Sequence, residues 1–244
     1  LICLLMSNKN RQPTTDNRQP TTDMQYFTSD FAQFFKDLSQ NNNKEYFHSQ
    51  KIRYEASVKK PFYKFLEDLI AEIQKYDPNL LVEPKDCVLR INRDIRFSKD
   101  KTPYNLHYTA FVSEGGRRDK SIPGIFLRFS PEMVGVMGGC FGIDKNQLAK
   151  IRDRIGSDIS SFRKVIEEPD FVSKFGEIQG HVIKRIPKDL KEIAEKEPLI
   201  LNKQFYFMTQ FSPNLISSEK LLDEIMTLWH SMRPVNEYLY NCIK

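Results

Sequence analysis

The sequence predicts an α+β fold in which a mainly antiparallel sheet, built from the central strands, is packed by N-terminal, central and C-terminal helices. Three observations support this prediction. Apolar residues at both ends of the chain recur with helical spacing, the middle contains short β-branched and aromatic runs, and the connections between those runs are short. Short connections require antiparallel pairing, and strands that follow one another without intervening helices argue against a doubly wound sheet.

Three helices are predicted in the N-terminal part of the chain. Ser29 or Asp30 can cap the first helix, and the asparagines at 41–43 end it or cap the next one. A second helix is predicted over 44–59. Pro61 suits the first position of a third, because its missing N–H would have no partner there. The third helix has the clearest apolar face of the chain, formed by Phe62, Phe65, Leu66, Leu69, Ile70 and Ile73.

The middle and C-terminal parts contribute the strands and the remaining helices. Strands are predicted over 88–97, 106–113, 123–130, 133–139, 181–186 and 204–211. Helices are predicted over 145–167 and 188–196, and a last helix has the core face Leu221, Leu222, Ile225, Leu228, Trp229 and Met232. Pro234 is expected to break or kink this last helix.

The chain is long enough to bury a sizeable core as one domain. It has 244 residues, of which 40% are hydrophobic, and a single α+β domain is predicted over 24–244. The heptad Asn-Arg-Gln-Pro-Thr-Thr-Asp occurs twice in succession over 10–23. Because these repeats are polar and have no apolar face to bury, residues 1–23 are predicted to be a disordered tail or a segment extraneous to the fold.

Composition narrows the class of protein. The net charge of +5 is well short of the basic bias of a dedicated nucleic-acid protein. No run of about 18 apolar residues occurs, so we expect no membrane partner. The four cysteines have no ligand-like spacing and predict neither a zinc site nor a disulfide framework, which favours a reducing, cytoplasmic location. Composition does not indicate the oligomeric state.

The most informative segment is 90–104, where five cations and two carboxylates lie within fifteen residues. If 88–97 is a strand, alternation places Arg90, Asp94 and Arg96 on its polar face and Arg93 among apolar side chains. Arg90 and Arg96 would then be about 20 Å apart, too far for one phosphate to contact both. Arg93 must find a carboxylate or a ligand, because an unpaired arginine on an apolar face is costly.

This segment predicts a site for a phosphate-bearing or other anionic small molecule. Arginine suits bidentate recognition of phosphate, lysines in the following loop add mobile charges, and a tyrosine or histidine nearby can donate a hydrogen bond. The predicted ligand-binding residues are Arg90, Arg93, Asp94, Arg96, Lys99, Lys101, Tyr104 and His107. The pattern identifies no catalytic residue, and whether the protein is an enzyme stays open.

Two alternatives remain. In the first, the same cations follow a nucleic-acid backbone, with further charge from Arg117, Arg118 and Lys120 and with stacking platforms at Tyr104, Tyr108 or Phe111. In the second, the segment has a purely structural role and the protein is an interaction module. Asp94 and Asp100 then hold the arginines in an internal network. The second alternative requires Arg96→Ala to destabilise the domain strongly.

The charged segment also resembles a known family. Arg-Ile-x-Arg-Asp-x-Arg-Phe-Ser-Lys-Asp-Lys-Thr-Pro-Tyr at 90–104, with Asn-Asn-x-Lys-Glu-Tyr-Phe at 41–47, is similar to the signature of a bacterial and fungal domain-of-unknown-function family, number 2461. The resemblance covers about residues 28–240. Tyr46 stands where the family pattern leads us to expect Trp, and Asn105 where it leads us to expect Lys. The resemblance implies a single intracellular domain without an established activity.

Other candidate motifs are weak. The glycines that precede the helix at 145–167 match neither a dinucleotide-binding fingerprint nor a P-loop, and we expect them to permit a bulge or close strand packing. They are Gly135, Gly138, Gly139 and Gly142. The histidines are His48, His107, His181 and His230, which lack ligand spacing, so no metal site and no cofactor are predicted.

Overall fold

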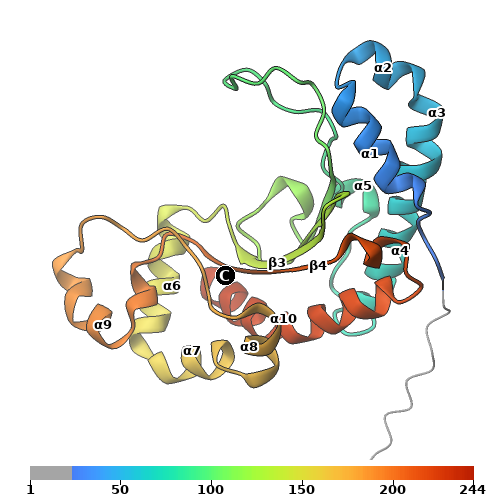
Figure 1. Ribbon diagram of the computed structural model, residues 1–244. Helices are drawn as coiled ribbons and strands as arrows, with labels where there is room; N and C mark the ends of the chain where they lie inside the picture. The colour runs from blue at the N-terminus through green and yellow to red at the C-terminus, as the bar shows by residue number, and fades with distance from the viewer. Residues whose placement is uncertain (1–23) are drawn as a thin grey trace, which may run out of the picture.

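The computed structural model describes residues 24–244 and contains one antiparallel sheet whose four strands lie side by side in chain order (Figure 1). The strands are β1 (Tyr108–Val112), β2 (Ile125–Phe129), β3 (Val134–Cys140) and β4 (Phe205–Phe211). Consecutive strands pair antiparallel throughout. The predicted α+β class and its central antiparallel sheet are therefore confirmed. The duplicated heptad lies outside the described residues.

Helices precede the sheet, interrupt it and follow it. The N-terminal helices are α1 (Asp30–Gln40), α2 (Lys44–Ser49), α3 (Lys51–Tyr54), a π-helical segment (Glu55–Lys59), α4 (Lys60–Gln74) and α5 (Pro84–Cys87). The later ones are α6 (Lys145–Ser157), α7 (Ile159–Ile166), α8 (Pro169–Phe175), α9 (Lys191–Lys196) and α10 (Leu221–Ile243). Short 3₁₀ turns occupy Gly116–Arg118, Lys188–Leu190, Pro198–Leu201 and Pro213–Ser217.

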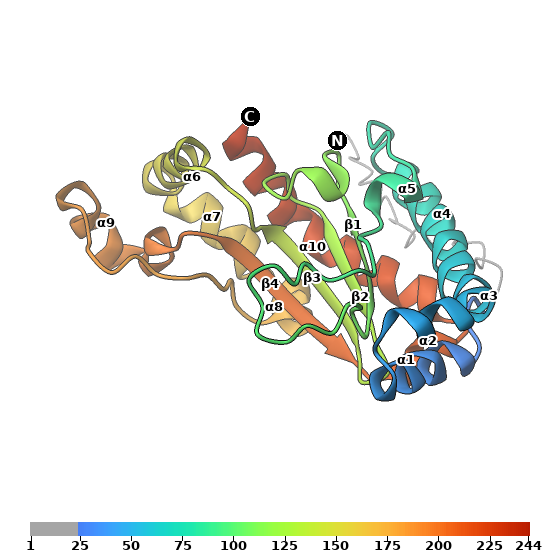
Figure 2. The same cartoon turned by 90° about the horizontal axis from the view of Figure 1, so that it is seen from above.

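The helices cover one face of the sheet and leave the other open (Figures 1 and 2). Helix α10 runs beneath the strands, and α4 and α8 pack beside it. Within residues 24–244, no helix is long and apolar enough to cross a bilayer.

Pro61 lies in the first turn of α4, as predicted, but α4 is not separate from the helix before it. The proline lies inside a continuous helical stretch that runs from α3 through the π-helical segment into α4. A proline in an α-helix lacks one N–H donor, and its ring clashes with the carbonyl four residues earlier. The wider π-helical turn that ends two residues before Pro61 accommodates both problems.

Residues 88–97 do not form the predicted strand. Among the described residues, its β-bridges are two isolated ones, Val88 to Ala110 and Asn92 to Tyr104. The N–H of Arg93 donates to the carbonyl of Pro103 over 2.8 Å, but proline has no N–H to return, so regular pairing ends there. Residues 93–103 then leave the sheet as a projecting loop, here called the arm, shown green above the open face in Figure 1.

The C-terminal half differs from the prediction at four places. The helix predicted over 145–167 divides at Asp158, whose side chain accepts the N–H of Ser161 and so begins α7. Helix α8 was not predicted, and 181–186 forms a single bridge at Val182 rather than a strand. Helix α10 continues through Pro234, because buried residues on both sides of the proline hold it against the core.

The glycines of β3 have structural roles. A side chain at Gly138 would lie 2.4 Å from the ring of Phe207 on β4 and 3.2 Å from the sulfur of Met232 on α10, so glycine is needed where β3 packs against both. Gly139 has a φ of 92°, and its N–H donates to the Asn236 amide oxygen of α10 over 2.9 Å. Both observations agree with the expectation of close packing rather than a phosphate loop.

Aromatic rings join the N-terminal helices to the sheet. The fully buried ring of Phe129 on β2 lies 5.3 Å from Phe62 and 5.5 Å from Phe65, both on α4, and 5.8 Å from Phe27. Edge-to-face rings at such distances add to the large apolar area that each ring buries.

We predict that Phe129→Ala lowers the free energy of unfolding by about 3–5 kcal/mol, because it removes a ring from the centre of this cluster and leaves a cavity. Phe97→Ala is the matched control, since that ring is 97% exposed on the arm and its loss should change stability by no more than about 0.5 kcal/mol. Urea unfolding measures both, and equal effects would contradict the assignment of the core.

Candidate functional site

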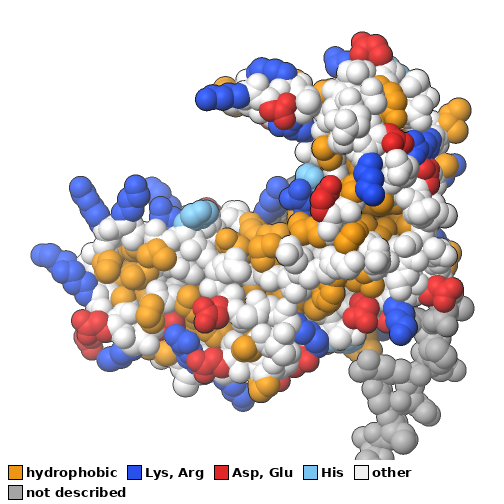
Figure 3. All heavy atoms as spheres, in the orientation of Figure 1, with side chains coloured by type: hydrophobic (Ala, Val, Ile, Leu, Met, Phe, Trp, Pro, Cys, Tyr) orange, Lys and Arg blue, Asp and Glu red, His pale blue; other side chains and the backbone are white. Residues whose placement is uncertain are grey.

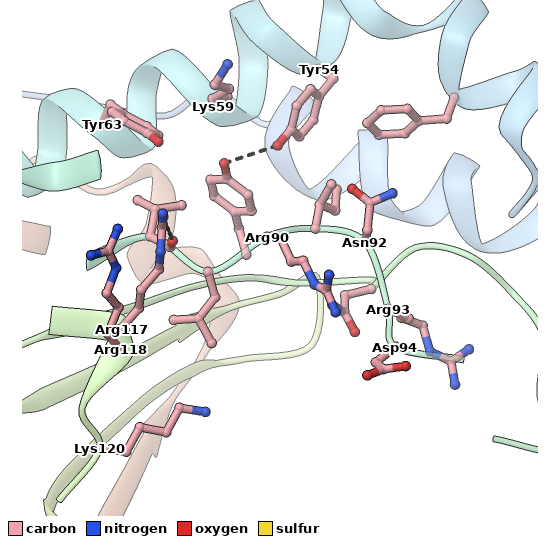
Figure 4. Close-up of a pocket in the computed structure, with 16 residues that line it drawn as sticks. Tyr54, Lys59, Tyr63, Arg90, Asn92, Arg93, Asp94, Arg117, Arg118 and Lys120 are labelled. Carbon is pink, nitrogen blue, oxygen red and sulfur yellow. Dashed lines mark hydrogen bonds between the residues drawn. The ribbon is translucent and has the colours of Figure 1, made fainter. Parts of the chain in front are cut away.

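An open cavity of about 900 Å³ lies between the N-terminal helices and the segment 88–94 (Figure 4). We call it the basic cavity, because six cations and one carboxylate line it. The cations are Lys59, Arg90, Arg93, Arg117, Arg118 and Lys120, and the carboxylate is Asp94. Neutral polar groups come from Tyr54, Tyr63, Asn92, Asn105 and Tyr108.

The π-helical segment places the helical side of the cavity. Tyr54 and Lys59 are five residues apart, which in an α-helix would separate them by about 140° around the axis. A π-helical turn repeats at i+5 and brings both to one side. Tyr63 follows four residues later, and all three residues line the cavity. Figure 4 shows the rings of Tyr54 and Tyr63 extending from the helices toward it. Lys59 keeps one carboxylate neighbour, Glu55, at 2.8 Å.

Two buried tyrosines connect the helices to the sheet edge at this cavity. The hydroxyl of Tyr54 donates to that of Tyr108 over 3.1 Å. Burial raises the pKa of Tyr108 to about 12 and also raises the pKa of Tyr54. Both hydroxyls therefore stay protonated at neutral pH and are suited to donate hydrogen bonds rather than to abstract protons.

The loop after β1 provides cations from the other side. Arg117 donates to the carbonyls of Lys85 and Val88, each over 2.7 Å, and so ties the loop to the chain before the arm. The side chains of Arg90, Arg118 and Lys120 make no hydrogen bond or ion pair with any residue of 24–244. These three cations face the same cavity without a carboxylate bound to them.

The arm uses its own charges to hold its shape. Arg93 lies 2.5 Å from Asp100, and it also donates to the carbonyl of Thr102 over 3.1 Å. The Thr102 N–H, together with Arg93, holds the pKa of Asp100 at about 2. Asp94 accepts two hydrogen bonds from the Arg96 guanidinium, at 2.6 and 2.9 Å, which lower its pKa to about 2. The partner that Arg93 required is therefore a carboxylate of the arm.

The structure divides the predicted site residues into two groups. Arg90, Arg93 and Asp94 line the basic cavity. Arg96, Lys99, Lys101, Tyr104 and His107 do not.

The residues outside the cavity have other contacts or none. Lys101 donates to the carbonyl of Ile95 over 2.9 Å, and Lys99 is exposed. Tyr104 is buried and stacks on Phe47 with ring centroids 4.1 Å apart. Its backbone exchanges hydrogen bonds with the Asn42 amide, which explains why the asparagine segment and the charged segment occur together.

His107 is half-buried beside the sheet. Burial lowers its pKa to about 4, and the nearby Arg128 lowers it further. The imidazole is therefore neutral at pH 7 and carries no charge toward an anion.

Sequence reasoning missed the helical contribution of Tyr54, Lys59 and Tyr63, because α-helical periodicity does not put the first two on one face. Arg117, Arg118 and Lys120 were predicted as additional cations for nucleic-acid binding and not as residues of the small-molecule site. The Gly-Gly-Arg-Arg sequence at 115–118 was the available signal for them.

Comparison with known families agrees with the motif. Residues 30–238 match the family described as conserved hypothetical protein (DUF2461). The chain belongs to this family. The match includes every residue that lines the basic cavity. Comparisons with curated proteins and with solved structures gave no match. Across residues 24–244, no group of three or more His, Cys, Asp or Glu side chains is placed to hold a metal ion.

His107 predicts a pH dependence of stability. Its pKa is about 4 in the folded state against an ordinary 6.5, so the folded form disfavours the protonated imidazole. The contribution of His107 is complete above pH 6.5 and is lost as the pH falls from 6.5 toward 4. We predict that His107→Gln loses less stability than the wild type between pH 7 and pH 5 in urea unfolding. The exposed His181→Gln is the control, and it should follow the wild-type profile.

The ion pair between Arg93 and Asp100 predicts a local rather than global effect. Arg93→Ala removes the closure of the arm, so amide exchange in residues 94–102 should become several-fold faster while the thermal midpoint changes little. Hydrogen exchange by mass spectrometry measures the faster exchange.

Arg96→Ala should also leave the thermal midpoint of the protein nearly unchanged, because the Arg96 side chain is 76% exposed. Unfolding of the Arg96→Ala protein would instead support the alternative in which the segment has a purely structural role.

Proposed function

We propose that the basic cavity binds a phosphate-bearing or other anionic small molecule. The observation that carries this proposal is that Arg90, Arg118 and Lys120 face one cavity without an ion-pair partner in residues 24–244. Cations that line one cavity without paired carboxylates give it a positive potential, which attracts an anion. Two of the three are arginines, which recognise phosphate or carboxylate in bidentate geometry.

The form of the cavity supports a small ligand. Its volume of about 900 Å³ is within the range of about 300–1,000 Å³ typical of small-molecule sites. Tyr63 and Asn92 add neutral polar groups that can orient a ligand. A nucleic-acid backbone requires cations along an extended groove, whereas these line a single cavity.

The proposal concerns binding, and we assign no catalytic residue. The buried tyrosines Tyr54 and Tyr108 have raised pKa values and are poor bases. We propose the cytoplasm as the place of action, because the three cysteines described are unpaired thiols, as expected in a reducing compartment: Cys87, Cys140 and Cys242.

A thermal-shift screen tests the proposal. Inorganic phosphate, pyrophosphate, sugar phosphates and nucleotides are the probes. A ligand at about a hundredfold excess over its Kd should raise the midpoint of a protein of this size by roughly 5–10 °C. Arg90→Ala/Arg118→Ala should lose this shift, because it removes two of the cations that face the ligand.

Lys99→Ala/Arg185→Ala is the matched control. It removes the same amount of charge from two exposed positions that do not line the cavity, and it should retain the full shift. An equal loss of the shift in both variants would indicate nonspecific attraction and contradict a site at the cavity. The absence of any shift with every probe would contradict the proposed function.

A further inference from the structure

A second cavity lies on the open face of the sheet. It has a volume of about 200 Å³, and we call it the aromatic pocket, because three rings and a methionine line it together with one lysine: Phe111, Phe126, Met137, Phe141 and Lys120. Figure 3 shows that the molecule is hollowed between the projecting arm and the sheet, with hydrophobic side chains along the floor of the hollow.

The sheet register builds this pocket. Phe111 on β1 pairs with Phe126 on β2, which pairs with Met137 on β3, so the three side chains form a row across the sheet. The row faces away from α10, because the alternate residues Ala110, Leu127 and Val136 belong to the main core. Phe111 is buried and the other two are half-buried, which leaves an apolar surface on the open face.

The basic cavity and the aromatic pocket are neighbours. Lys120 lines both of them. The loop that carries Lys120 is fixed to the wall of the pocket, because the Lys120 carbonyl accepts the N–H groups of Phe141 and Gly142 at 3.2 and 3.1 Å. The Ser121 hydroxyl next to it accepts the Gln147 amide over 2.9 Å. These hydrogen bonds fix the position of the Lys120 loop relative to the aromatic pocket.

We propose that the ligand of the basic cavity is a phosphate ester that also carries a flat ring system, as a nucleotide does, and that this ring occupies the aromatic pocket. This inference rests on the proposed function. An apolar cavity of about 150 Å³ is enough to bind benzene, so the aromatic pocket has room for a ring rather than for a whole ligand. Lys120 lies where the charged and flat parts of such a ligand join.

Isothermal titration with mononucleotides tests the inference. The probes are AMP, GMP, CMP and UMP. Ribose 5-phosphate is the reference, because it carries the same phosphate and sugar without the aromatic base. At least one mononucleotide should bind about tenfold more tightly than ribose 5-phosphate, the advantage expected of a base stacked on aromatic side chains.

Substitutions at Phe126 test whether the tighter binding of mononucleotides arises in the aromatic pocket. Phe126→Leu removes the ring but keeps an apolar side chain, so it should abolish the advantage of the mononucleotide and leave the affinity for ribose 5-phosphate unchanged. Phe97→Ala is the control, since that ring is 97% exposed and lines neither cavity. Circular dichroism verifies that each variant is folded, and Phe126→Tyr, which keeps the ring, should retain the advantage.

The outcomes separate the inference from the proposed function. If ribose 5-phosphate binds as tightly as all four mononucleotides, or if Phe126→Leu keeps their advantage, the inference is wrong and the proposed function stands. If neither ribose 5-phosphate nor any mononucleotide binds, the inference is wrong, and the proposed function then depends on the inorganic phosphate, pyrophosphate and other sugar-phosphate probes of the thermal-shift screen. A single-stranded oligonucleotide that binds more tightly than every mononucleotide would replace the inference with nucleic-acid binding.

Discussion

The packing of the N-terminal helices against the sheet edge is the constraint on which the candidate site depends. Phe62 of α4 lies 4.8 Å from Tyr108 and 5.3 Å from Phe129, so one ring contacts two strands. The same contact sets the distance from the helices to the segment 88–94, and with it the width of the basic cavity. Because the cavity lies between two parts of the fold, its cations come from segments far apart in the chain.

Charge satisfaction distinguishes the two halves of the charged motif. The residues of the arm pair with one another: Asp100 holds Arg93, and Asp94 holds Arg96. Arg90, three residues before the arm, has no such partner in the part of the chain that the structure describes. The charged segment 90–104 therefore has two roles. The ion pairs of the arm shape the loop, and the unpaired Arg90 contributes positive charge to the basic cavity.

The fold could be predicted from the sequence where one local preference dominates. The apolar face of α4 and the runs of β1 to β4 were of this kind. The segment 88–97 was not, because its alternation is correct for a strand while the missing N–H of Pro103 ends the pairing. At the site, Arg90 and Arg93 could be identified from the clustering of charge at 90–104. Lys59 could not, because a π-helical turn leaves no periodic signal in the sequence.

The π-helical segment also bears on how the family can vary. A π-helical turn is equivalent to one residue inserted into an α-helix. Deletion of a single residue within Glu55–Lys59 would restore regular winding and rotate the preceding turn by about 100° relative to α4. The pairing of Tyr54 with Tyr108 and the salt bridges of Arg53 to α1 would then be lost together. Chain length in this one turn is therefore expected to be less free to change among relatives than the identity of its exposed side chains.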